Sequence, residues 1–320
     1  MGRSMNVLSA DNLDASALKR LEAAGFRVTQ CKGLAADALP AVAETTDILI
    51  VRSTVVSAGI LPGFPALKLI LRAGAGTDTI DVAAASARGI QVSNTPGRNA
   101  DAVAEMALGL LLATDRRIAE ATWALRQGKW TKGALGQGLG LKGRTLGIAG
   151  LGAVGRALAR KALGLDLRVI AWSPRLTIDA AKQAGADLAA SLEELARRSD
   201  AVSVHIASTA ETRNLIGRAF FTAMKPGSLF VNTSRGEVVD RTALIEAIRT
   251  KGLKVGLDVF AGEPKVPEAD FEDTELAQLV VGTPHLGAST DQAAEAVAAE
   301  VVRILTEFRA TGSAPNAVKD

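Results

Sequence analysis

The sequence has no tyrosine, a single cysteine and only two histidines in 320 residues, and aromatic side chains make up just 3% of it. The one cysteine, Cys31, cannot form an intrachain disulfide, which is consistent with a reducing cytoplasm. Because few rings are available to stack on bases, and lysine and arginine never occur in runs longer than two, no nucleic-acid-binding surface is expected. No apolar stretch approaches the roughly 18 residues of a membrane span, and the first residues lack the apolar core of a signal peptide. We therefore predict a cytoplasmic protein with neither nucleic-acid nor membrane partners.

Charge and hydrophobicity are those of a globular chain. Hydrophobic residues make up 48% and charged residues 22% of the sequence, so it can bury substantial cores. Its length suffices for two domains of common size. The formal net charge of +3 suits a small anionic ligand.

The placement of glycine is the most informative feature. The apolar run Thr145–Ala149 predicts a buried strand and leads into Gly150, Gly152 and Gly155, the pattern G-x-G-x-x-G at the start of a helical pattern. In such a unit the first glycine permits the turn, the second lets the backbone approach a pyrophosphate, and the third lets helix and strand pack closely. The N–H groups at the helix start attract phosphate. An ordinary glycine turn is the alternative, but the flanking strand and helix favour a dinucleotide site.

Elsewhere, short apolar runs alternate with helical patterns, as in a parallel sheet covered by helices. Strands are expected at 7–8, 27–29, 48–51, 67–71 and 90–92, and then at 145–149, 167–171, 201–204, 229–232, 255–257 and 279–281. Helices are expected at 15–24, 35–43, 82–88, 99–117, 118–128 and 291–308. The last helix has no strand after it, so we expect it to return to the first α/β unit and make that domain discontinuous.

Candidate catalytic side chains follow predicted strands of the second unit. Arg235 follows 229–232, Glu263 follows 255–257, and His285 follows 279–281. Ligands of open α/β sheets bind beyond the carboxyl ends of strands, so these three groups can converge. An arginine can grip a carboxylate, a histidine can move a proton, and a glutamate can stabilise the imidazolium. The alternatives are a structural histidine at a strand end and two surface charges; the other histidine, His205, also ends a strand and could lie beside a cofactor.

Several longer motifs resemble those of the D-isomer-specific 2-hydroxyacid dehydrogenases, especially the D-3-phosphoglycerate dehydrogenase branch without a regulatory domain. They are VRSTVV (51–56), LRAGAGTDTID (71–81), SNTPGRNADAVAEMALGLLLA (93–113), GIAGLGAVGR (147–156), NTSRGEVVD (232–240), LDVFAGEP (257–264) and PHLGAST (284–290). The resemblance implies an α/β fold with a flavodoxin-like, discontinuous substrate-binding domain at 1–98 and 286–320. It also implies a Rossmann NAD(P)-binding domain at 99–285.

The resemblance further assigns roles to single residues. Arg235, Glu263 and His285 correspond to the catalytic set, in which the histidine exchanges a proton with the substrate 2-hydroxyl while hydride passes between C2 and the nicotinamide. The N–H groups of Ala75 and Gly76 correspond to the substrate-carboxylate loop. Positions near the distal end of the substrate are Arg52, Ser53, Arg72 and Asn99. The expected cofactor residues are Gly150, Gly152, Ala153, Val154, Gly155, Ser173, Pro174, Arg175, His205, Ile206, Thr212, Thr233, Asp258 and Gly287. No metal site is expected.

Two features bear on the substrate and cofactor. Arg52 and Arg72 could pair with a phosphate, which favours oxidation of 3-phosphoglycerate to 3-phosphohydroxypyruvate, a step of serine biosynthesis. If they are only rim charges, a glyoxylate or hydroxypyruvate reductase is the alternative, and a non-catalytic nucleotide-sensing interaction protein is another. About 20 residues beyond the glycine loop, where NAD-selective sites carry an acidic residue, the sequence has Ser173 with Arg175 nearby, so NAD and NADP both remain possible and NADP is slightly favoured.

The long apolar stretch between Asn99 and Gly128 exceeds what one domain face requires. The resemblance implies a homodimer, and we expect these helices to form its contact.

Overall fold

The computed structural model describes residues 4–11, 13, 15–31, 36–264 and 268–318. The chain divides into two compact units, one made of Met1–Asn99 with Ser289–Asp320 and the other of Ala100–Ala288. Each unit has its own parallel sheet, so the α/β class is confirmed. Among the described residues, no helix is long and apolar enough to cross a bilayer.

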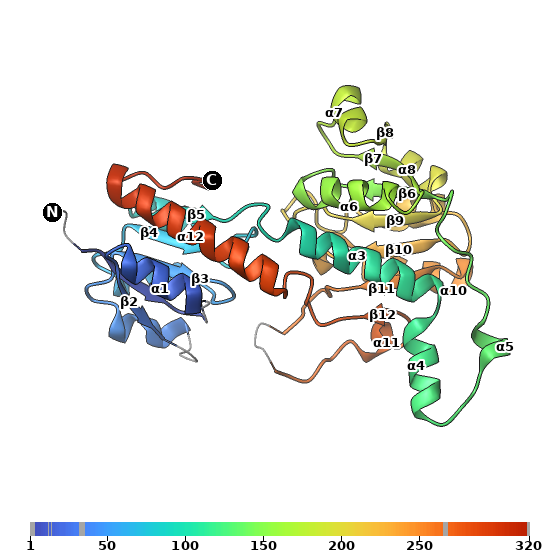
Figure 1. The fold of residues 1–320 in the computed structure, drawn as a ribbon, viewed down its shortest axis with the longest axis horizontal. Coiled ribbons are helices and arrows are strands. Elements are labelled where there is room, and N and C mark those ends of the chain that lie inside the picture. The colour runs from blue at the N-terminus through green and yellow to red at the C-terminus, as the bar shows by residue number, and fades with distance from the viewer. Residues whose placement is uncertain (1–3, 12, 14, 32–35, 265–267, 319–320) are drawn as a thin grey trace. The chain divides into compact units, whose positions relative to one another are not determined.

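The first unit has a five-stranded parallel sheet in the order β2-β1-β3-β4-β5, which is the flavodoxin-like order. Its strands are β1 (Asn6–Ser9), β2 (Arg27–Gln30), β3 (Ile48–Val51), β4 (Leu69–Arg72) and β5 (Gln91–Asn94). Its α-helices are α1 (Ala15–Ala23), α2 (Val82–Ala87) and the C-terminal α12 (Asp291–Thr311), and the 3-10 segments are η1 (Ala36–Val42) and η2 (Leu61–Gly63). The returning helix α12 (red) packs beside α1 (Figure 1).

Both faces of this sheet are covered. Along β3, Ile48 and Ile50 join the core beneath α1 and α12, whereas Leu49 and Val51 join the core on the opposite face, with η1, η2 and α2. Successive side chains of a strand point to opposite faces, so a strand buried on both sides reads as a continuous apolar run. The run ILIV at 48–51 was therefore a reliable strand signal.

The structure corrects the α-helix that the sequence predicts at 35–43. Ala35 lies outside the described residues, and Ala36–Val42 forms a 3-10 helix that contains Pro40. Proline has no N–H to donate and crowds the preceding turn, so it disfavours a regular α-helix. The strand expected at 279–281 is also misplaced, because the pairing residues are Val281 and Gly282.

The second unit has a seven-stranded parallel sheet in the order β12-β11-β10-β9-β6-β7-β8. Its strands are β6 (Thr145–Ala149), β7 (Arg168–Trp172), β8 (Asp187–Leu188), β9 (Ala201–Val204), β10 (Leu229–Asn232), β11 (Lys254–Leu257) and β12 (Val281–Gly282). The order reverses between β6 and β9, as in the Rossmann arrangement, and ligands bind at such a switch point.

Helices cover this sheet on both sides. In chain order, the helices of this unit begin with α3 (Ala100–Asp115), α4 (Ile118–Arg126), α5 (Lys132–Leu135), α6 (Ala153–Leu163) and α7 (Ile178–Gln183). They continue with α8 (Leu192–Arg198), α9 (Arg218–Ala223), the 3-10 turn η3 (Gly236–Val238), α10 (Arg241–Lys251) and α11 (Thr274–Ala277). Helices α3 and α6 lie in the core on one face of the sheet, and α8, α9 and α10 lie in the core on the other. Buried α3 lies against α6, whereas α4 and α5 (green) extend away from the sheet (Figure 1).

Candidate active site

The glycine loop is built for close backbone contact. Gly150 has φ of +102°, and a Cβ there would lie 2.5 Å from the His205 carbonyl oxygen. A Cβ at Gly155 would lie 2.2 Å from the Gly150 oxygen, so the third glycine allows helix α6 to meet the loop. At Gly152, by contrast, a Cβ would point into open space, and this residue caps α6 without any side-chain bond. The loop thus offers uncapped N–H groups beside free volume, which fits the pyrophosphate of a dinucleotide.

Ser173 follows strand β7 and is tied to the glycine loop. Its Oγ accepts a hydrogen bond from the Leu151 N–H at 2.7 Å. Pro174 and Arg175 come next and are exposed, so the guanidinium is accessible to a ligand. The segment therefore presents a hydroxyl and a cation, and no carboxylate, where the ribose of a dinucleotide is expected.

His205 ends strand β9 beneath this loop. Its Nε2 lies 2.9 Å from Ser203 Oγ and its Nδ1 3.4 Å from Thr233 Oγ1. Burial lowers the pKa of His205 to about 3, so its ring stays neutral near pH 7. It is therefore suited to hold two strand ends together and unsuited to proton transfer.

His285 and Glu263 form a hydrogen-bonded pair. His285 Nδ1 bonds Glu263 Oε1, and Glu263 Oε2 accepts the Phe260 N–H at 3.2 Å. Burial raises the pKa of Glu263, but the hydrogen bond with His285 and the positive charges of His285 and Arg235 outweigh it, so the pKa lies below its ordinary value. The His285 side chain is 44% exposed. Because Nδ1 is engaged, Nε2 is the ring atom that can exchange a proton with a ligand.

Arg235 is placed beside this pair by its backbone. At the end of β10 the buried Asn232 donates through Nδ2 to the Arg235 carbonyl at 2.9 Å and accepts the Ser234 N–H at 2.9 Å. A Cβ at Gly236 would lie 2.1 Å from the Ala261 nitrogen, so only glycine lets this loop pack on the one that carries Glu263. Sequence reasoning missed both anchors, although the NTSRG motif contains them.

Asp258 organises the loop that carries His285. The buried Asp258 carboxylate accepts three hydrogen bonds: Oδ1 from Thr283 Oγ1 at 2.7 Å and the Leu286 N–H at 2.8 Å, and Oδ2 from the Gly287 N–H at 2.8 Å. Its carbonyl also accepts the His285 N–H at 2.8 Å. His285 has φ of +54°, a left-handed conformation that is unfavourable for a residue with a Cβ. The bonds to Asp258 offset this cost.

The remaining predicted cofactor residues belong to the same unit. Ile206 is buried directly after His205, and Thr212 Oγ1 donates to the Ala207 carbonyl at 2.7 Å. A Cβ at Gly287 would lie 2.7 Å from Asp258 Oδ2.

The predicted substrate residues all belong to the first unit: Arg52, Ser53, Arg72, Ala75, Gly76 and Asn99. After β3, Asp11 Oδ2 accepts the N–H groups of Arg52, Ser53 and Thr54 at 2.5, 3.1 and 3.1 Å. At the end of β4, the Arg72 guanidinium lies over Gly74, where a Cβ would come within 1.3 Å of it. Sequence reasoning did not identify Asp11.

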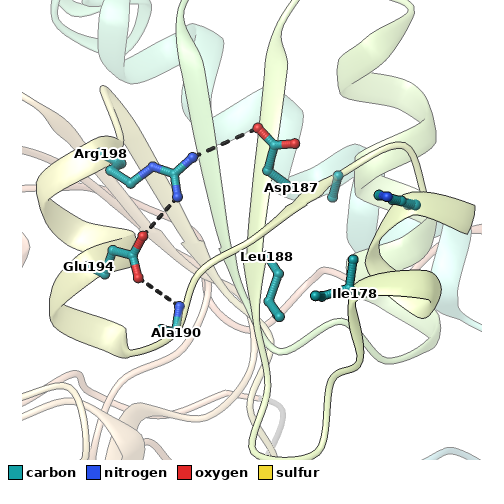
Figure 2. A pocket seen from close by; sticks show the side chains of 8 residues that line it. Ile178, Asp187, Leu188, Ala190, Glu194 and Arg198 are labelled. Carbon is teal, nitrogen blue, oxygen red and sulfur yellow. Dashed lines mark hydrogen bonds and ion pairs between the residues drawn. The ribbon is translucent and has the colours of Figure 1, made fainter.

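A pocket away from these residues lies at the edge strand β8 between α7 and α8 (Figure 2). It has a volume of about 500 Å³. Three of its four charged side chains pair with one another, since Arg198 bonds Glu194 at 2.8 Å and lies 3.8 Å from Asp187; the fourth is Lys182. Glu194 also accepts the Ala190 N–H. Because three of the four charges are already paired, few polar groups of this pocket are free to converge on a ligand as those of a catalytic site do.

Comparisons with known proteins agree with this geometry. Residues 108–287 match the family described as D-isomer specific 2-hydroxyacid dehydrogenase, NAD binding domain. The chain is 36% identical over 309 residues to a D-3-phosphoglycerate dehydrogenase of Methanocaldococcus jannaschii, covering 94% of this chain and 57% of that protein, which is less than two thirds of its length. It is 42% identical over 268 residues to a hydroxypyruvate reductase of Thermotoga maritima, covering 83% of this chain and 86% of that one.

Among solved structures, a similar one is an NADPH-dependent glyoxylate/hydroxypyruvate reductase of Sinorhizobium meliloti in complex with NADP and malonate. The TM-score is 0.80, the identity is 29%, and the alignment covers 99% of this chain and 97% of that one.

Proposed function

This chain belongs to the D-isomer-specific 2-hydroxyacid dehydrogenases, and on that premise we propose that it transfers hydride between an NAD(P) nicotinamide and C2 of a D-2-hydroxy acid. The observation that carries the proposal is the hydrogen-bonded pair of His285 and Glu263. Arg235 lies close enough to lower the pKa of Glu263, and the glycine loop belongs to the same unit.

Each catalytic side chain has a distinct task in oxidation. As the C2–H bond breaks with its electron pair, His285 Nε2 takes the proton of the 2-hydroxyl, and the bonding electrons of that O–H become the second bond of the keto group. Glu263 stabilises the imidazolium that forms, and Arg235 binds the carboxylate and the reacting oxygen. The nicotinamide, when bound, supplies the hydride acceptor. In reduction, His285 returns the proton to the keto oxygen.

For the cofactor we propose that NADP is preferred over NAD. NAD-selective sites carry a carboxylate at this place, and it would repel a 2′-phosphate. Here the Ser173–Arg175 segment has a hydroxyl and an exposed guanidinium instead, and the guanidinium could bind that phosphate. Gly152 would let the pyrophosphate approach the backbone, and the N–H groups of Ala153 and Val154 would bind it, while Gly150 and Gly155 shape the loop.

For the substrate we propose 3-phosphoglycerate, because Arg52 and Arg72 could bind its phosphate. One observation favours the alternative, a glyoxylate or hydroxypyruvate reductase. The Asp11 carboxylate occupies the N–H groups of the Arg52 loop and adds a negative charge beside the position expected for a phosphate. A non-catalytic nucleotide-sensing protein would show no turnover at all.

The test is a steady-state assay of reduced nicotinamide absorbance that crosses NAD(H) and NADP(H) with 3-phosphoglycerate, hydroxypyruvate and glyoxylate. A kcat/KM advantage for 3-phosphoglycerate that is lost in Arg52→Ala or Arg72→Ala would support the phosphate assignment. A higher kcat/KM for glyoxylate or hydroxypyruvate, unchanged in both variants, would replace it with the reductase. Absence of turnover with every pair would refute the enzymatic proposal.

We also propose a homodimer formed through the arm that contains α4 and α5. Large apolar side chains are exposed there, at Ile118, Trp123, Leu125, Trp130 and Leu139. The cytoplasmic location expected from the single cysteine stays a prediction.

A further inference from the structure

The N–H groups of Ala75 and Gly76, which the proposed function assigns to the substrate carboxylate, depend on how their peptide planes are turned. The Gly74 carbonyl accepts the Thr95 N–H at 3.0 Å, and the Ala75 carbonyl accepts Asn94 Nδ2 at 2.6 Å. Both carbonyls therefore point towards the end of β5, at Asn94 and Thr95. No cis peptide bond is present among the described residues.

In a planar trans peptide the N–H points opposite to the carbonyl of the same unit. The Ala75 N–H shares a peptide with the Gly74 carbonyl, and the Gly76 N–H shares one with the Ala75 carbonyl. Because both carbonyls face the β5 side, both N–H groups face away from it. Two successive N–H groups on one side form a small concave site for an anion such as a carboxylate.

Of the two bonds that set this orientation, one comes from the backbone of Thr95 and the other from a side chain, that of Asn94. Asn94 is itself held in place: its carbonyl accepts Asn316 Nδ2 at 3.3 Å, and the C-terminal segment pairs with β5 through an antiparallel bridge between Ser93 and Ala317. Its amide is thus a donor on a fixed backbone rather than on a free loop end.

We propose that Asn94 is a positioning residue that orients the Gly76 N–H for binding the substrate carboxylate. This inference rests on the proposed function, since it assumes that Ala75 and Gly76 receive C1 of the substrate. Asn94 acts on the carboxylate that all D-2-hydroxy acids share, and not on the distal group that distinguishes them. Its loss therefore weakens binding of every substrate by a similar factor.

The test compares Asn94→Leu and Asn94→Asp with wild type. Both variants keep the approximate size and remove the donor, and leucine does so without adding a charge. We expect Asn94→Leu to raise KM for 3-phosphoglycerate, hydroxypyruvate and glyoxylate by about tenfold each, the value of one ordinary hydrogen bond, while kcat changes less than about twofold. Asn94→Asp should raise KM further, because its charge repels both the Ala75 carbonyl and the substrate.

Ser93→Ala is the matched control. It lies one residue away on β5 and loses the hydrogen bond from Ser93 Oγ to the Pro315 carbonyl, 2.5 Å long, without touching the Ala75 loop. The dissociation constant of NADPH, measured by fluorescence, should be unchanged in all variants. A KM for Asn94→Leu within twofold of wild type, or an equal rise in Ser93→Ala, would overturn the proposal.

A second readout separates this inference from the proposed function. The dissociation constant of oxamate, a carboxylate analogue of the keto acids, is measured by calorimetry on enzyme saturated with NADPH. It should rise about tenfold in Asn94→Leu and stay constant in Ser93→Ala. If wild-type enzyme turned over none of the acids, the proposed function would fail. Weaker oxamate binding by Asn94→Leu than by wild type would still support the role of Asn94, and equal binding by the two would refute it.

Discussion

Replacing Asp258 by asparagine should loosen the loop that presents His285. The wild-type carboxylate accepts three hydrogen bonds, two at Oδ1 and one at Oδ2, and is 1% exposed. An asparagine oriented to keep the two bonds at Oδ1 turns its NH₂ group towards the Gly287 N–H. It then loses one charge-assisted bond and leaves two buried donors facing each other, which costs about 3 kcal/mol.

That cost has two measurable consequences. The free energy of unfolding, from urea titration, should fall by about 3 kcal/mol, and kcat should fall at least about tenfold, because His285 must keep a left-handed backbone that Asp258 stabilises. The matched control is Thr283→Val, which removes a single bond to the same carboxylate and should cost about half as much. The reasoning would be refuted if Asp258→Asn kept both quantities at wild-type values. A fall in kcat with unchanged stability would point instead to direct contact with the cofactor.

Three further predictions concern other parts of the molecule. Glu263→Gln should lower kcat by at least about tenfold, since the imidazolium loses its counter-charge. Because the pKa of Glu263 is lowered in the folded protein, its charge stabilises the fold above the ordinary carboxyl pKa, and this contribution is lost as pH falls through the lowered value. The difference in unfolding free energy between wild type and Glu263→Gln should therefore vanish in acid. A difference that stays constant from pH 7 to pH 3 would contradict this prediction. Ser173→Asp should lower kcat/KM with NADP at least about tenfold more than with NAD while its carboxylate still accepts the Leu151 N–H, and equal losses would disprove selectivity at this position. Trp123→Glu, at a ring that is 62% exposed, should convert the proposed dimer into a monomer on size-exclusion chromatography, and an unchanged elution volume would place the contact elsewhere.

Prediction from the sequence was most accurate at positions where the structure admits only one kind of residue. A run such as 48–51 is apolar throughout because both faces of the sheet are covered, so its strand could be predicted to the residue. The glycine loop was equally readable, because close backbone contact at Gly150 and Gly155 admits no side chain. The short edge strand β8 was missed, since two residues have no periodicity, and Pro40 was overlooked inside an apparently helical pattern.

The site was harder to predict than the fold. Motif position identified Arg235, Glu263 and His285 as candidates, and the structure joins the last two by a hydrogen bond. The pattern could not reveal the residues that hold them. Asn232 and Asp258 are buried polar side chains whose partners are mostly backbone N–H and carbonyl groups of loops, and such partners have no sequence signature.

These anchoring residues follow a common physical logic. A parallel strand ends with backbone groups that no neighbour pairs, and the loop beyond it must satisfy them. A short polar side chain at or just beyond the strand end does so from a rigid position: Asn232 for the Arg235 loop, Asp258 for the His285 loop, Asn94 for the Ala75 loop, and Asp11, two residues after β1, for the loop after β3. Because each anchor bonds backbone groups of its loop, it constrains where the neighbouring side chains lie. Kinetic effects of Asn232, Asp258 and Asn94 variants should therefore be shared by all substrates, since the loops they hold are expected to act on groups that all D-2-hydroxy acids have in common.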